Sequence, residues 1–186
     1  MAPQPMMPAR SIHVFESLDI HAFSHQTRAF LKIQDGCNQF CSYCIIPYAR
    51  GAERSIAPAQ AVSIARTMAE HGHQEIVLSG IHTGRYGRDQ GTTLLQLLKQ
   101  LIDATPEQVR YRISSIEMNE IDDAFIAYMK QEPRIARHLH IPIQAASDEV
   151  LAAMNRPYDT AWFAQRMRDI RAQLPGISIS TDMIAG

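Results

Sequence analysis

Residues 28–44 read RAFLKIQDGCNQFCSYC, an apolar run followed directly by Cys37, Cys41 and Cys44. The run at 29–34 predicts a strand. Seven extended peptide steps reach roughly 25 Å, so the loop after this strand can place three thiolates around an iron-sulfur cubane. Thiolates are the soft ligands that such clusters select. Because the sequence holds only 3 cysteines, one iron would lack a protein thiolate and stay open to a substrate or cofactor.

Other interpretations of the cysteines remain open at this point. They could be structural core residues, although free cysteines are normally scattered through a core. A ferredoxin-like electron carrier would need a fourth cysteine near the first three. A zinc site with three cysteines and one histidine is a further alternative, although no histidine shows the close pairing of a zinc ribbon. The histidines available for it are His25, His71, His73 and His82.

Beyond this loop, apolar stretches alternate with amphipathic helical patterns. The predicted strands are 29–34, 75–79, 110–115, 138–143 and 177–184, and the predicted helices are 58–71, 92–104, 122–132, 147–154 and 160–174. Strands separated by helices favour a parallel sheet, and repeated βα units favour a full or partial barrel. We therefore predict an α/β fold, a partial (βα) barrel with about five parallel strands and functional residues in the loops after them.

Several boundaries follow from single residues. Thr92 and Thr160 are the expected helix N-caps. Pro142 should end or fray its strand, because proline removes a ladder donor. Residues 1–27 contain several prolines and no sustained period, which predicts a tail or linker before a core domain at 28–186. The sequence stops at Gly186, directly after an apolar strand, so we expect a fragment truncated at its C-terminal end, or an edge covered by another chain.

The amino-acid composition bears on nucleic-acid binding, membrane association and cellular compartment. Hydrophobic residues make up 46% of the chain, and 18 basic residues nearly balance 19 acidic ones, so no electrostatic footprint for nucleic acid is present. No apolar run has the roughly 18 residues of a membrane span, and the start lacks the apolar core of a secretion signal. A cytoplasmic setting without membrane association is expected, and the grouped cysteines fit a cytosolic metal site.

The cysteine spacing after a first barrel strand resembles the signature of the radical S-adenosylmethionine superfamily. The longer run DGCNQFCSYCIIPYARG (35–51) is similar to the methylthiotransferase family, in the branch that modifies threonylcarbamoyladenosine in tRNA. Later segments agree with this resemblance, which spans about Arg28 to the end. They are LSGIHTGRYG (78–87), RISSIE (112–117), HLHIPIQ (138–144), MNRPY (154–158) and TDMIAG (181–186).

The resemblance implies a [4Fe-4S] cluster on the three cysteines, with S-adenosylmethionine on its fourth iron. It also implies cofactor contacts elsewhere in the chain. Tyr43 would lie against the adenine and Gly80 near the methionine amino group, Gln144 and Ser147 would contact the ribose, and Ile184 with Gly186 would begin a last adenine-binding motif. Glu117 would face the substrate or cofactor. The histidines at 138 and 140 share a strand face and receive no catalytic role.

Reductive cleavage of S-adenosylmethionine would then yield a radical that removes hydrogen from C2 of the modified adenosine next to the anticodon. The implied partners are tRNA, bound through the full-length protein, and an electron donor such as a flavodoxin or ferredoxin. Loop arginines on the cluster side of the predicted barrel could grip RNA phosphates, although solvated surface arginines are the plainer interpretation. They are Arg50, Arg54, Arg85 and Arg88.

The chain departs from the family in several places. Relatives carry an N-terminal domain with three further cysteines for an auxiliary cluster and a C-terminal RNA-binding module, so this piece alone should not complete the reaction. Ala145 and Ala146 replace a usual Ser-Gly pair, and Met118 replaces a common proline. The rival hypotheses are a methylthiotransferase for isopentenyl-type tRNA adenosine or for ribosomal protein S12, a non-catalytic zinc-binding module, and an inactive partial gene product.

Overall fold

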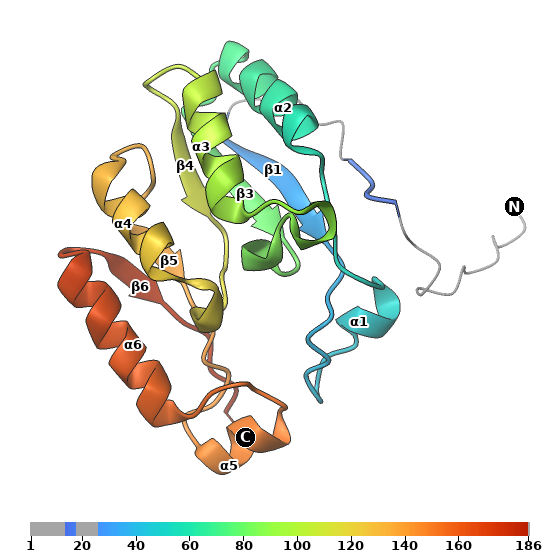
Figure 1. The fold of residues 1–186 in the computed structure, drawn as a ribbon, viewed down its shortest axis with the longest axis vertical. Coiled ribbons are helices and arrows are strands. Elements are labelled where there is room, and N and C mark those ends of the chain that lie inside the picture. The colour runs from blue at the N-terminus through green and yellow to red at the C-terminus, as the bar shows by residue number, and fades with distance from the viewer. Residues whose placement is uncertain (1–13, 18–25, 186) are drawn as a thin grey trace, which may run out of the picture.

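The computed structural model describes residues 14–17 and 26–185 and has the predicted α/β architecture (Figure 1). The strands are β1 (Arg28–Asp35), β2 (Arg54–Ser55), β3 (Glu75–Gly80), β4 (Arg110–Ile113), β5 (His138–His140) and β6 (Ser178–Ser180). The helices are α1 (Ile46–Ala49), α2 (Pro58–Glu70), α3 (Leu94–Ala104), α4 (Asp123–Gln131), α5 (Asp148–Ala153) and α6 (Thr160–Gln173). Short 3₁₀ turns occur at η2 (Thr83–Arg85), η3 (Arg88–Gln90) and η4 (Met118–Glu120).

The sheet confirms the predicted partial barrel. A 4-stranded sheet has the order β2-β1-β3-β4, in which β1, β3 and β4 are parallel and only β2 is antiparallel. A parallel bridge between Tyr111 and Ile135 joins β4 to the residues before β5, and β5 pairs in parallel with β6. The parallel strands therefore follow one another in chain order, and their carboxyl ends lie at the same end of the sheet.

Helices α2 and α3 cover one side of this sheet, and α4 and α6 lie beside β5 and β6 (Figure 1). Helix α3 shows why the sequence folds this way. Its apolar side chains recur every three to four residues, and those on the inner face are buried: Leu94, Leu97, Leu98, Leu101 and Ile102. Strand β3 lies between β1 and β4, and its three consecutive apolar residues, Ile76, Val77 and Leu78, are all buried, as expected for a strand covered on both faces.

Both predicted N-caps are wrong by one residue. Thr93 caps α3 in a capping box with Gln96, whereas Thr92 donates a hydrogen bond to the Gln96 side chain. Asp159 caps α6 by accepting a hydrogen bond from the Trp162 amide. In each case the side chain that reaches the free amide of the first turn lies one residue from the one we expected.

Strands β5 and β6 are shorter than expected. β5 ends at His140, two residues before Pro142, which agrees with the loss of a ladder donor at proline. β6 ends at Ser180, and beyond it a single bridge joins Gln144 to Met183. The sequence patterns did not indicate α1 or β2, both of which are very short.

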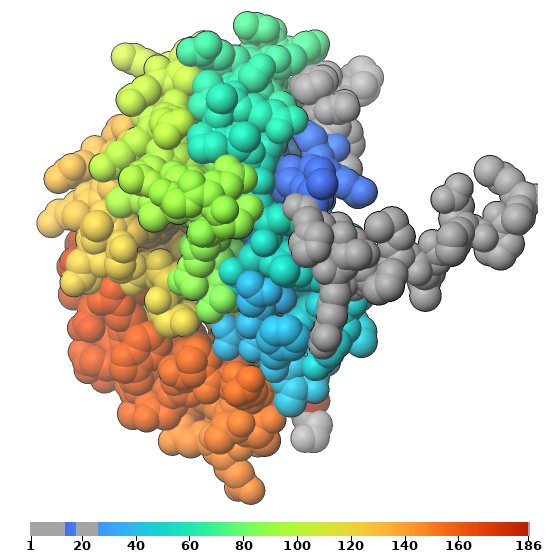
Figure 2. Space-filling model, turned by 45° about the vertical axis from the view of Figure 1, so that its right-hand side comes forward, coloured from blue at the N-terminus to red at the C-terminus, as the bar shows by residue number. Residues whose placement is uncertain are grey.

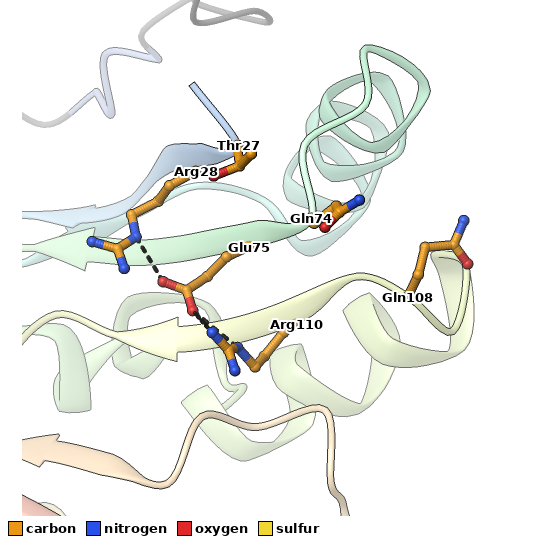
Figure 3. Close-up of a pocket in the computed structure, with 6 residues that line it drawn as sticks. All are labelled: Thr27, Arg28, Gln74, Glu75, Gln108 and Arg110. Carbon is orange, nitrogen blue, oxygen red and sulfur yellow. Dashed lines mark hydrogen bonds and ion pairs between the residues drawn. The ribbon is translucent and has the colours of Figure 1, made fainter. Parts of the chain in front are cut away.

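An ionic cluster joins the starts of three strands at the sheet end opposite the cysteine loop. Arg28, Glu75 and Arg110 lie opposite one another in register, and both arginines contact the Glu75 carboxylate (Figure 3). Arg112 contacts the same carboxylate at 2.9 Å. The Glu75 side chain is 8% exposed. Burial opposes its ionisation, but the hydrogen bonds from the arginines lower its pKa to about 2. We interpret this cluster as a cross-strand contact that holds the sheet together.

Part of the N-terminal segment contacts the domain. Within the segment predicted as a tail, Phe15 packs against the core, and the Val14 carbonyl accepts a hydrogen bond from Arg54 Nε at 3.1 Å. None of the described helices combines the length and apolar character that crossing a membrane requires.

Candidate functional site

The three cysteines lie in the loop that follows the carboxyl end of β1. All three are free thiols of intermediate exposure, and they line one cavity of about 260 Å³. The other residues lining this cavity come from the loops after β1, β3, β4 and β5 and from the segment after α5. They are Gln39, Tyr43, Ile46, Ile81, His82, Ser115, Glu117, Pro142, Gln144 and Arg156. The cavity thus lies where a barrel is expected to carry its functional residues.

A buried carboxylate holds the base of the cysteine loop. Asp35 is 1% exposed and pairs with Lys32 at 2.8 Å, with Arg50 at 2.9 Å and with Arg54 at 2.9 Å. Burial raises the pKa of this carboxyl, but hydrogen bonds from Arg50, Lys32 and the Gly36 amide outweigh that effect and lower it to about 2. Asp35 therefore connects the end of β1 to the segment that returns from the loop.

Gly36 makes the turn that leads into Cys37. Its φ is +72°, and a Cβ atom built there would lie 2.6 Å from the Ala52 carbonyl carbon and 2.7 Å from Gly51 O. The Cys37 amide donates a hydrogen bond to Gly51 O at 3.0 Å, which closes the loop at its base. A side chain at position 36 would occupy the space through which these two backbone segments approach each other.

Gln34 ties the cysteine loop to the loop after β3. It is fully buried, its Nε2 donates to Gly36 O at 2.8 Å, and its Oε1 accepts from the His82 amide at 2.7 Å. Gly80, at the end of β3, leaves room for this contact, since a Cβ there would lie 3.0 Å from Gln34 Cβ. The two loops are therefore placed relative to each other by one side chain.

The tip of the cysteine loop docks on the turn after α5. Ser42 donates from its amide to Met154 O at 3.2 Å and from Oγ to Ala153 O at 2.7 Å. Asn155 adopts a left-handed φ of 58° and donates from Nδ2 to Phe40 O at 3.1 Å. In Figure 2 the light-blue atoms of the cysteine loop lie directly beside the orange atoms of the α5 region.

His82 lies against the first cysteine. It is 6% exposed, its Nδ1 is 3.4 Å from Cys37 Sγ, and its Nε2 is 2.8 Å from Glu120 Oε1. Glu120 also pairs with Arg85 at 3.1 Å. Burial disfavours the charged ring, but the contacts with Cys37 and Glu120 raise the pKa of His82 to about 9.

Arg156 lies against the second cysteine. Its Nη1 is 3.5 Å from Cys41 Sγ, and its Nη2 pairs with Glu117. Arg156 also donates from Nε to the Tyr158 hydroxyl at 3.2 Å, and Tyr158 OH donates to Pro142 O. Glu117, which the sequence placed at the end of the third strand, therefore faces this cavity with a cationic partner.

The structure brings some of the expected cofactor residues together and not others. Tyr43 and Gln144 line the cavity with the cysteines. Burial and the nearby Cys41 charge raise the pKa of Tyr43 to about 12, so its phenol stays protonated. Gly80 precedes the lining residues Ile81 and His82 and faces Gln34.

Ser147 and Ile184 do not line this cavity. Ser147 is the N-cap of α5, where its hydroxyl accepts from the Val150 amide. Ile184 is 54% exposed, and its amide donates to Gln144 O at 2.8 Å. Gly186 lies outside the described residues.

No pattern in the sequence predicts a role for Arg156, and His82 was expected only as a possible zinc ligand. Both lie in segments quoted above, 154–158 and 78–87, but no local pattern indicates that their side chains reach a cysteine. His71 and His73 bond instead to the carbonyls of Thr67 and Gln26, and His25 lies outside the described residues.

The donor set fits a polynuclear cluster. Three thiols from one loop line a shared cavity, and a cubane binds each thiolate at a different iron. Among residues 14–17 and 26–185, no three side chains of histidine, cysteine, aspartate or glutamate are grouped to hold a metal ion.

Three of the four loop arginines are engaged within the protein. Arg50 and Arg54 pair with Asp35, and Arg54 is only 6% exposed. Arg85 pairs with Glu53 at 2.7 Å and with Glu120. These pairs organise the cysteine loop and its neighbours, so the arginines act as internal partners in this structure.

Comparison with known proteins agrees with this geometry. Residues 31–186 match the family model described as the radical SAM superfamily. The chain is 45% identical over 174 residues to a Bacillus subtilis protein named threonylcarbamoyladenosine tRNA methylthiotransferase MtaB, covering 93% of this chain and 39% of that one. It is 38% identical over 159 residues to a Chlorobium luteolum protein named tRNA-2-methylthio-N(6)-dimethylallyladenosine synthase, covering 85% and 35% of the two chains.

A solved structure supports the fold. The radical S-adenosylmethionine methyltransferase TsrM from Kitasatospora setae, solved with cobalamin and a [4Fe-4S] cluster, superposes with a TM-score of 0.69 at 15% identity. The match covers 85% of this chain and 31% of that one. Since this chain spans less than two fifths of the two curated relatives named above, those proteins contain much that has no counterpart here.

Proposed function

Because this chain belongs to the radical SAM superfamily, we propose that Cys37, Cys41 and Cys44 bind a [4Fe-4S] cluster and that S-adenosylmethionine binds at its fourth iron. The observation that carries this proposal is the shared cavity lined by three free thiols after β1. When bound, such a cluster supplies the electron for reductive cleavage of S-adenosylmethionine, which yields a hydrogen-abstracting radical.

The residues of this chain would position the groups that react. Asp35, Gly36 and Gln34 fix the base of the cysteine loop, and the turn at residues 153–156 fixes its tip. Tyr43 would place a neutral aromatic ring beside the adenine, and Gln144, which lines the same cavity, would face the ribose. The roles expected for Gly80, Ser147 and Ile184 are proposals that rest on resemblance alone.

For the full-length protein, we propose methylthiolation of N6-threonylcarbamoyladenosine in tRNA next to the anticodon. The name of the Bacillus subtilis relative supports this substrate, and the Chlorobium luteolum relative supports the isopentenyl-type adenosine as the alternative. The partners would be tRNA and an electron donor such as a flavodoxin or ferredoxin, in the cytoplasm. We further propose that the radical domain begins near residue 28 and that residues 1–27 form a tail or linker.

Anaerobic reconstitution tests the cluster. The chain should bind about four irons, as a cubane requires, and should release 5′-deoxyadenosine when reduced with S-adenosylmethionine. Cys41→Ala should lose both properties. Asn38→Ala changes an exposed residue of the same loop and should keep them. One zinc per chain without iron, or unchanged cofactor cleavage in Cys41→Ala, would refute the proposal.

Nucleoside analysis tests the substrate. In cells that lack the full-length gene, tRNA should contain threonylcarbamoyladenosine without its methylthio group, while the isopentenyl-type methylthio nucleoside persists. Mass spectrometry of digested tRNA measures both products in one sample. Loss of the isopentenyl-type product alone would assign this protein to the other branch.

A further inference from the structure

His82 makes a contact that the proposed cluster does not by itself require. Its Nδ1 lies 3.4 Å from Cys37 Sγ, at the distance of a hydrogen bond to sulfur, and the Gln39 amide donates to the same sulfur at 3.3 Å. The ring is 6% exposed, so water does not compete for the contact. The Cys37 sulfur thus has a side-chain hydrogen-bond partner as well as a backbone donor.

Two contacts hold His82 in this orientation, one on its backbone amide and one on its ring. Gln34 Oε1 accepts a hydrogen bond from the His82 amide at 2.7 Å. Glu120 Oε1 lies 2.8 Å from Nε2, and Arg85 holds the same carboxylate oxygen. Gly84 lets this carboxylate approach, because a Cβ atom there would lie 2.8 Å from Glu120 Cβ and 3.0 Å from Glu120 Cδ.

The two partners of the ring are both acceptors. A cluster-bound cysteine is a thiolate without a proton and can only accept, so Nδ1 must supply the proton of this contact, while Glu120 lies at ion-pair distance from Nε2. Carboxylate–histidine pairs of this kind orient groups around metal sites. Here the pair would direct Nδ1–H at the Cys37 sulfur.

We propose that His82 is a positioning residue that donates a hydrogen bond to the Cys37 sulfur and raises the reduction potential of the cluster. This inference rests on the proposed binding of the cluster to Cys37. One-electron reduction increases the negative charge on the cluster and its thiolates, so a donor at a ligand sulfur stabilises the reduced form more than the oxidised form. Without His82, reduction would become harder.

The test is a redox titration of the reconstituted protein, followed by the electron paramagnetic resonance signal of the reduced cluster. His82→Phe keeps a ring but removes the donor, and should shift the ratio of reduced to oxidised cluster about tenfold toward the oxidised form. For a one-electron couple this is a potential lower by about 59 mV. His71→Phe alters an exposed histidine away from the cavity and should leave the potential unchanged.

Glu120→Gln provides a second measurement if His82→Phe does not retain its cluster. It preserves the size of the side chain but weakens the hold on Nε2, so the potential should fall in the same direction by a smaller amount. Equal potentials in the wild type and the cluster-retaining variants would overturn the inference. A wild-type protein that binds no iron would instead refute the proposed function.

Discussion

Gly36→Ala should destabilise the cysteine loop much more than the same substitution at another left-handed glycine. Two costs add at position 36. The φ of +72° disfavours a side chain by about 1–2 kcal/mol. The new Cβ would also lie 2.6 Å from the Ala52 carbonyl carbon, and such overpacking typically costs about 1–3 kcal/mol more. Because the Cys37 amide bonds to Gly51 O, relief of this contact would move the first cysteine.

Gly72→Ala is the matched control. Its φ is +87°, but nothing lies within 4 Å of the added Cβ, so only the backbone cost applies. Urea denaturation of both variants under anaerobic conditions measures the difference, which should be about 1–3 kcal/mol, or roughly one molar in midpoint. Iron content should fall in Gly36→Ala and not in Gly72→Ala. Equal losses of stability and equal iron content would show that the close approach at position 36 has no energetic weight.

Two further predictions concern the anchors of the sheet and the loop. Because the pKa of Glu75 is lowered from its usual 4.5 to about 2, its stabilising contribution is complete above pH 4.5 and is lost as the pH falls toward 2. The stability difference between wild type and Glu75→Gln, from urea curves across that range, should shrink toward acid; a constant difference would contradict this. Asn155→Gly keeps the left-handed backbone and should cost about 1 kcal/mol for the lost bond to Phe40 O. Asn155→Ala should cost about 1 kcal/mol more, and identical urea midpoints would exclude that backbone effect.

Much of the fold was predictable because its signals are local. The apolar periods of α2, α3 and α6 and the apolar runs of β1 and β3 located these elements to within a few residues. Errors occurred where the signal came from one side chain, as at Thr92 and Thr160. Helices and strands of only a few residues, such as α1 and β2, have too few positions to show any period.

The candidate site was predictable in part: the three cysteines, Tyr43, Glu117 and Gln144 were expected and line the cavity. The three cysteines can be recognised as a ligand set from their spacing alone, because all three lie within eight residues of one loop. The side chains that contact these cysteines cannot be recognised from local spacing. His82 is 45 residues from Cys37, and Arg156 is 115 residues from Cys41.

The sequence by itself determined the βα alternation, the place of the cysteine loop after β1 and the set of thiols available to a cluster. Only the tertiary structure decided which side chains surround those thiols, that Ser147 caps a helix away from them, and that Asn155 holds the tip of the loop. The physical reason is that strand order and sheet curvature bring the carboxyl ends of distant strands together, and no local periodicity encodes which side chains then meet.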